Sequence, residues 1–180
     1  MIPASFDKKQ AQELVEDIEN DLQRLTRVHA DLEKSEKLLE KSDRDDDAYY
    51  KFVEAASTEL HGLYTGIEKT FERVIIFNTG QRPQGEDFHK LILKTIHEEL
   101  KLTSDDTNEF LKALSSFRHL FRHAYGIELN PAQIIDATRQ ACLQWPVIRN
   151  ELEYFLTELK KRISDRDSQG RKPQSPDSPG

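Results

Sequence analysis

A helical apolar pattern runs through residues 47–77, DAYYKFVEAASTELHGLYTGIEKTFERVIIF, and sets the architecture expected for the whole chain. Its apolar side chains recur every three or four residues, which places them on one face of a helix. They are Phe52, Ala56, Leu60, Leu63, Tyr64, Ile67, Phe71 and Val74. The segment therefore predicts a long amphipathic helix that needs other helices to cover its apolar face.

Two glycines, Gly62 and Gly66, lie four residues apart inside this pattern. A glycine within a helix costs about 0.5–1 kcal/mol relative to alanine, so another element is expected to approach closely there. That element is either another helix of the same chain or a second subunit, and the sequence leaves both possibilities open.

Similar reasoning predicts four more helices. Leucines, isoleucine and valine recur at helical spacing over residues 7–41, and shorter patterns occupy residues 86–101 and 104–125. Asn130 followed by Pro131 is a typical helix start, so a last helix is expected over residues 131–163, kinked or broken at Pro146. The predicted fold is all-α, with a helical domain at 1–163 and a disordered polar tail at 164–180.

Composition limits the class of protein. The chain has 180 residues, of which 36% are hydrophobic and 33% charged, enough for one domain with a moderate core. The formal net charge of −7 argues against a general nucleic-acid coat, so any anion site must be a local basic patch. With a single cysteine, Cys142, no intramolecular disulfide is possible, which fits a reducing compartment. No signal peptide or apolar run of about 20 residues stands out, and a cytoplasmic location is expected.

A concentrated group of polar side chains lies within SSFRHLFRHAYG, residues 115–126. On an ideal helix Arg118, Arg122 and Tyr125 fall on one side, flanked by His119 and His123. The opposite arc is apolar and is expected to be the buried one: Phe110, Leu114, Phe117, Leu120, Phe121 and Ala124. Gly126 then follows as a typical residue for a helix end.

These residue types have three chemical interpretations. A histidine can transfer protons near neutral pH and an arginine can stabilise a phosphorane, so together they can cleave RNA without a metal. One histidine is too few for both proton transfers, and a two-fold dimer would supply the second. Spacing alone favours a polar helix end that pairs with acids of neighbouring helices. A metal pair, His119 and His123, is geometrically possible but has no evident third ligand.

Arg118, His123 and Tyr125 resemble the Arg-x4-His-x-Tyr signature of HEPN-domain ribonuclease toxins of the HepT type. The run from Leu60 to Glu72 is similar to the second helix of those proteins, and Gly85 to Leu91 resembles the entry to their third helix. The likeness covers most of residues 10–160.

This resemblance implies an up-and-down bundle of about five helices that forms a two-fold dimer, with the motif helices at a shared cleft. It implies that Arg118 and His123 cleave RNA without cofactor or metal, with His119 and Arg122 in support. It also implies that a minimal nucleotidyltransferase (MNT) antitoxin silences the toxin by AMPylation of Tyr125. A non-catalytic helical adaptor, which binds a nucleotidyltransferase or a nucleotide through the same cationic surface, is the alternative.

Overall fold

The computed structural model describes the backbone of residues 2–85, 87–123 and 130–170, and the side chains of these ranges except 117–123, 167, 169 and 170. These ranges contain α1 (Lys8–Lys41), α2 (Asp47–Thr79), α3 (Phe88–Lys94), the π-helical segment η1 (Thr95–Glu99), α4 (Asp105–His123) and α5 (Pro131–Gly170). The described ranges hold no strand, so the all-α prediction is confirmed. None of their helices is long and apolar enough to cross a membrane.

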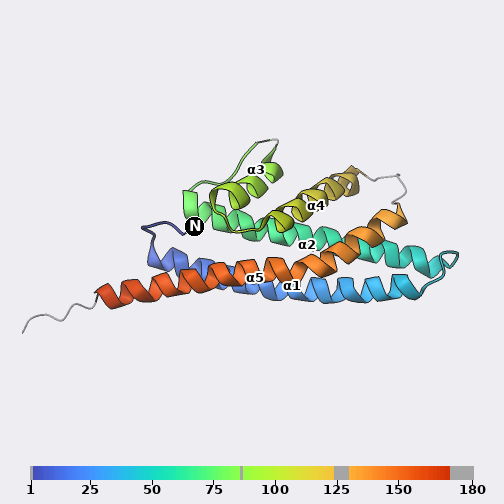
Figure 1. Cartoon of the computed structure of the whole chain (residues 1–180), viewed down its shortest axis with the longest axis horizontal. Coiled ribbons are helices and arrows are strands. Elements are labelled where there is room, and N and C mark those ends of the chain that lie inside the picture. Colours follow the sequence, from blue (N-terminus) through green and yellow to red (C-terminus); the bar gives the residue numbers. More distant parts are fainter. Residues whose placement is uncertain (1, 86, 124–129, 171–180) are drawn as a thin grey trace, which may run out of the picture.

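The three long helices α1, α2 and α5 pack on one another, and α3 and α4 cover one side of α2 (Figure 1). Successive long helices run in opposite directions, as Figure 1 shows for α1, α2, α4 and α5. The chain is therefore an elongated up-and-down bundle, as expected.

One continuous apolar core joins the helices, and α1, α2 and α5 supply most of it. The close approach at the glycines of α2 comes from α1 of the same chain. A Cβ atom built at Gly66 would lie 2.5 Å from Cδ2 of Leu25, and one at Gly62 would lie 3.8 Å from Cγ1 of Val28. Of the two possibilities that the sequence left open, the approaching element is thus a helix of the same chain.

The helix ends follow the local sequence. Asp7 and Asp46 cap α1 and α2 by accepting hydrogen bonds from Gln10 N and Ala48 N, at 2.9 and 3.0 Å. Gly80 ends α2 in the left-handed conformation, with φ of 70°. The side chain of Asn130 accepts from Ala132 N at 3.0 Å, and Pro131 occupies the first position of α5.

Helix α5 differs from the prediction at two points. It continues through Pro146, so the proline does not break it; Trp145 and Ile148, on either side, are both buried in the core. The predicted end at residue 163 is wrong, because α5 extends to Gly170. Of the predicted disordered tail at 164–180, residues 164–170 are therefore helical, and residues 171–180 lie outside the described residues.

Two arginines explain the longer helix. Arg162 Nη1 donates to Ile2 O at 2.9 Å, and Arg166 Nη1 donates to Phe6 O at 2.6 Å. The Arg166 guanidinium also lies 4.2 Å from the centroid of the Phe6 ring, a cation–π contact. The polar end of α5 is thus held by the N-terminal segment, an interaction between opposite ends of the chain that local composition does not indicate.

Candidate functional site

The candidate residues belong to the C-terminal end of α4. The backbone of Arg118, His119, Arg122 and His123 lies in the last two turns of this helix. Their side chains, and Tyr125 entirely, lie outside what the structure describes. The structure thus gives the position of four of the five residues along the helix and the elements that support it.

A carboxylate from α5 fixes the start of α4. Glu151 Oε1 accepts a hydrogen bond from Ser104 N at 2.8 Å and another from Thr107 Oγ1 at 3.2 Å. Ser104 Oγ accepts from Thr107 N at 3.3 Å, as a helix cap does. The negative charge of Glu151 is also favourable beside the positive end of the helix dipole. Helix α4 is therefore attached to α5 by its first turn.

His97 supports the turn that leads into α4. Its Nδ1 atom is 3.1 Å from Thr103 O, and its Nε2 atom is 3.3 Å from Asp105 Oδ1. These contacts connect η1 with the first residue of α4, so His97 has a structural role.

The side of α4 that packs on the bundle is marked by Leu111 and Leu114, both buried. Position 118 follows Leu111 by seven residues and Leu114 by four, so its backbone lies on that packed side. Position 123 follows Ser116, which is exposed, by seven residues, so its backbone lies on the same side of the helix axis as that of Ser116. The two positions are about 140° apart around the helix axis.

The side of α4 that packs on the bundle differs from the side expected from the sequence. Leu114 is buried and Phe110 is half-buried, as expected for the apolar arc. Leu111 is buried too, although it was not placed in that arc. The side of α4 that faces the bundle therefore includes the backbone positions of Arg118 and Arg122. The ideal helix projection had placed these two positions on the side that faces away from the bundle. The reason is that α4 packs on α2, α3 and α5 at once, which covers a wider arc.

A buried polar network lies between α2 and α3. Glu68 is 6% exposed, and its Oε1 atom accepts a hydrogen bond from Tyr64 Oη at 3.0 Å. Nδ1 of His89, on α3, lies 2.5 Å from the same oxygen. Both helices that hold this network also pack on α4. Glu68 was not among the residues predicted from the sequence, although its position four residues after Tyr64, on the apolar face of α2, is a signal that local spacing contains.

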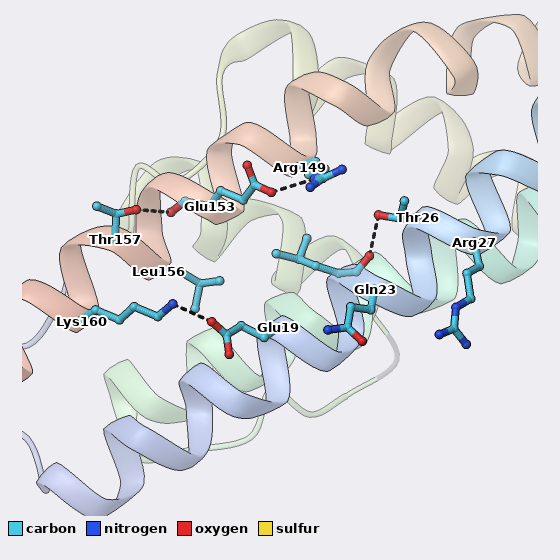
Figure 2. Close-up of a pocket in the computed structure, with 10 residues that line it drawn as sticks. Glu19, Gln23, Thr26, Arg27, Arg149, Glu153, Leu156, Thr157 and Lys160 are labelled. Carbon is cyan, nitrogen blue, oxygen red and sulfur yellow. Dashed lines mark hydrogen bonds and ion pairs between the residues drawn. The ribbon is translucent and has the colours of Figure 1, made fainter.

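An open groove separates α1 from α5 on another part of the surface, and Figure 2 shows the side chains that line it. Lys160 Nζ is 2.6 Å from Glu19 Oε1, and Arg149 Nε is 2.7 Å from Glu153 Oε1. These pairs neutralise four of the five charged side chains that line the groove, and the fifth is Arg27, so the groove offers no cluster of like charges for a ligand. Within the described residues, no group of three His, Cys, Asp or Glu side chains could hold a metal.

The single cysteine is not suited to nucleophilic chemistry. Burial, together with the neighbouring Glu36, raises the pKa of Cys142 to about 12. Its thiol is therefore protonated at neutral pH, and the protonated form is a poor nucleophile.

The described helices form an all-α up-and-down bundle in which the basic segment lies at the C-terminal end of α4. A family model described as HepT-like protein matches residues 55–159, which is more than half of the chain and extends from α2 into α5. The chain therefore belongs to the HepT-like protein family, which confirms the resemblance noted in the sequence. The family associates it with HEPN-type toxins of toxin–antitoxin systems. A search of curated proteins found no match.

Proposed function

We propose that this protein is the toxin of a HEPN/MNT toxin–antitoxin pair and acts as a metal-independent endoribonuclease. One observation carries the proposal: the Arg118-x4-His123-x-Tyr125 spacing, whose first two members lie in the last two turns of α4, falls inside the region that matches the HepT-like family. In this proposal Arg118 and His123 are the catalytic residues, and His119 and Arg122 support them.

The chemistry follows from the residue types. A neutral imidazole accepts the proton of the RNA 2′-hydroxyl, whose oxygen attacks the adjacent phosphorus. The bond from phosphorus to the 5′-oxygen breaks, and that oxygen takes a proton from an imidazolium. The permanently charged Arg118 guanidinium stabilises the additional negative charge of the phosphorane. The step needs no metal and leaves a cyclic phosphate.

In this proposal the site is shared by two protomers, which accounts for the separation of Arg118 and His123 around α4. Positions 118 and 123 are about 140° apart around one helix, so a single α4 presents them in different directions. In the proposed two-fold dimer the C-terminal ends of the two α4 helices lie side by side, with position 118 of one protomer near position 123 of the other. It also supplies the second histidine that the two proton transfers require.

Tyr125 is the proposed site of control. A nucleotidyltransferase antitoxin would transfer AMP to its phenol oxygen, two residues beyond His123. The added phosphate would bring bulk and negative charge beside the cleft, which opposes binding of RNA phosphates.

The test is cleavage of RNA by purified protein in the presence of a metal chelator. We expect His123→Ala to lower the cleavage rate by roughly 10²–10⁴-fold, the range for loss of a general acid–base group. Arg118→Ala should lower it by roughly 10²–10³-fold, the range for loss of one group that stabilises transition-state charge. Lys112→Ala is the matched control, because Lys112 is an exposed cation on the same helix. Uncut RNA, with protein that is folded and unmodified at Tyr125, would contradict the nuclease and favour the adaptor.

The modification is tested separately, by intact mass after incubation with the partner and ATP. We expect a gain in steps of one AMP for the natural protein and none for Tyr125→Phe. A Tyr125→Phe variant that still gains this mass would exclude the assigned tyrosine.

A further inference from the structure

The outward face of α5 exposes three large apolar side chains. Leu143 is 68% exposed, Val147 41% and Tyr154 70%. They are four and seven residues apart, so they form one stripe along the helix. Opposite them, Ile148 and Leu152 of the same helix are fully buried in the core. Helix α5 is therefore apolar on two faces, only one of which the fold covers.

The exposed stripe has the periodicity of a coiled-coil seam. Alternating steps of four and three residues connect eight exposed side chains: Asp136, Gln140, Leu143, Val147, Asn150, Tyr154, Thr157 and Lys161. This repeat of 3.5 residues is the spacing that keeps one helix in contact with a partner helix over several turns. The apolar members lie in the middle of the seam, and the charged members lie at its ends.

The seam of one α5 helix is complementary to the same seam on a second α5 helix that runs in the opposite direction. If a second copy of α5 is placed antiparallel, with the two-fold axis between residues 148 and 149, Leu143 faces Tyr154 of the second copy. Val147 then faces Asn150, and Gln140 faces Thr157. Each layer pairs the two alternating positions of the heptad, as in an antiparallel coiled coil.

The charges agree with the same register. Asp136 faces Lys161 of the second copy, so the two-fold generates two pairs of opposite charge at the ends of the seam. A parallel arrangement in register would place Asp136 against Asp136 and Lys161 against Lys161, which is repulsive.

We propose that α5 mediates self-association, as an antiparallel pair with a second copy of this chain centred between residues 148 and 149. The proposal is independent of the nuclease function. In this pair the two α5 starts, and the motif helices that precede them, lie about 50 Å apart along the axis. The α5 contact is therefore a different surface from the shared cleft of the proposed nuclease.

Cysteine cross-linking tests the register directly. In a Cys142→Ser background, the double variant Leu143→Cys/Tyr154→Cys places two thiols opposite each other in the pair. We expect it to form a covalent dimer under mild oxidation. Each single variant should stay uncross-linked, because its two copies are about 16 Å apart in this register. The proposal would be overturned if the single variants cross-linked as fast as the double variant. It would also be overturned if the double variant formed no covalent dimer.

Charge reversal tests the ends of the seam. We expect Lys161→Glu to weaken self-association, measured by sedimentation at micromolar concentrations, and Asp136→Lys/Lys161→Glu to restore it. Lys112→Glu is the matched control, the same change on an exposed face of α4. Equal effects of Lys161→Glu and Lys112→Glu would refute the register.

A pair of tyrosine variants tests the centre. We expect Tyr154→Ser to weaken self-association roughly 10- to 100-fold, as for an aromatic anchor, and Tyr50→Ser, on an exposed part of α2, to leave it unchanged. RNA cleavage should not depend on Tyr154, so the two proposals fail separately. A Tyr154→Ser protein whose association equals that of the natural chain contradicts the α5 contact, even if a partner protein binds that face.

Discussion

Gly66 of α2 lies directly against Leu25 of α1, so closely that a Cβ atom at position 66 would be 2.5 Å from Leu25 Cδ2. Leu25 is buried in the core, and side chains in a close-packed core cannot shift without moving their neighbours. Four residues earlier, a Cβ atom at Gly62 would be at an ordinary contact distance of 3.8 Å from Val28. Close packing against α1 therefore excludes a larger residue at position 66 but not at position 62.

This difference predicts opposite effects of alanine at the two positions. Gly62→Ala should stabilise the protein by about 0.5–1 kcal/mol, because it removes the helix penalty of glycine without a clash. Gly66→Ala removes the same glycine penalty, but it forces Leu25 out of its position at a cost of about 1–3 kcal/mol. We therefore expect Gly66→Ala to lower the free energy of unfolding. Urea unfolding of both variants measures the change. If both variants gained stability equally, the close packing at Gly66 would be refuted.

Glu151 should matter for α4 through its hydrogen bonds. Glu151→Ala leaves Ser104 N and the buried Thr107 hydroxyl without this acceptor, and we expect a loss of about 1–3 kcal/mol in the free energy of unfolding. Glu151→Gln keeps a carbonyl acceptor and loses only the charge beside the helix end, about 0.3–1 kcal/mol. Glu153→Ala, which removes an exposed pair with Arg149, is the control and should cost less. Similar losses for Ala and Gln at position 151 would contradict the hydrogen-bonding role.

Arg166 should protect the N-terminal segment. Without its guanidinium, the carbonyl groups of Ala4 and Phe6 lose their donors, so Arg166→Ala should speed hydrogen exchange and proteolysis near residues 2–7. Arg166→Lys should restore little, because an ammonium cannot reproduce the planar, forked contact. Arg149→Ala, on the same helix, is the control. Unchanged exchange in Arg166→Ala would show that the end of α5 is not held in this way.

Glu59 should make stability depend on pH. Burial raises the pKa of this carboxyl in the folded protein, so the folded state disfavours its ionised form. The favourable contribution of the protonated group is complete below the unfolded pKa and is lost as the pH rises through the folded pKa. Glu59→Gln should therefore unfold at higher urea than the natural protein at pH 7. The difference in stability between Glu59→Gln and the natural protein should vanish when the pH is below the pKa of this carboxyl in the unfolded chain, near 4.5. An advantage that persists at low pH would have another cause.

Much of the fold was predictable because the helices follow from the spacing of apolar residues and from the capping residues at their ends. The apolar pattern of residues 47–77, the Asp46 cap and Gly80 are properties of neighbouring residues, and α2 follows them closely. The Asn130–Pro131 start of α5 is local in the same way. The spacing from Arg118 to Tyr125 pointed to the family for the same reason, since it is a pattern of residues close together in the sequence.

What the sequence determined by itself is the set of helices, most of their limits and the family to which the chain belongs. Tertiary structure decided which helix approaches Gly66, which side of α4 packs on the bundle, and where α5 ends. It also brought Glu68 and His89 together from different helices. The physical reason is that helix propensity, capping and amphipathic spacing act over a few residues, whereas these contacts join residues far apart in the chain. Arg166 meets Phe6 across 160 positions, and only the packed bundle brings them together.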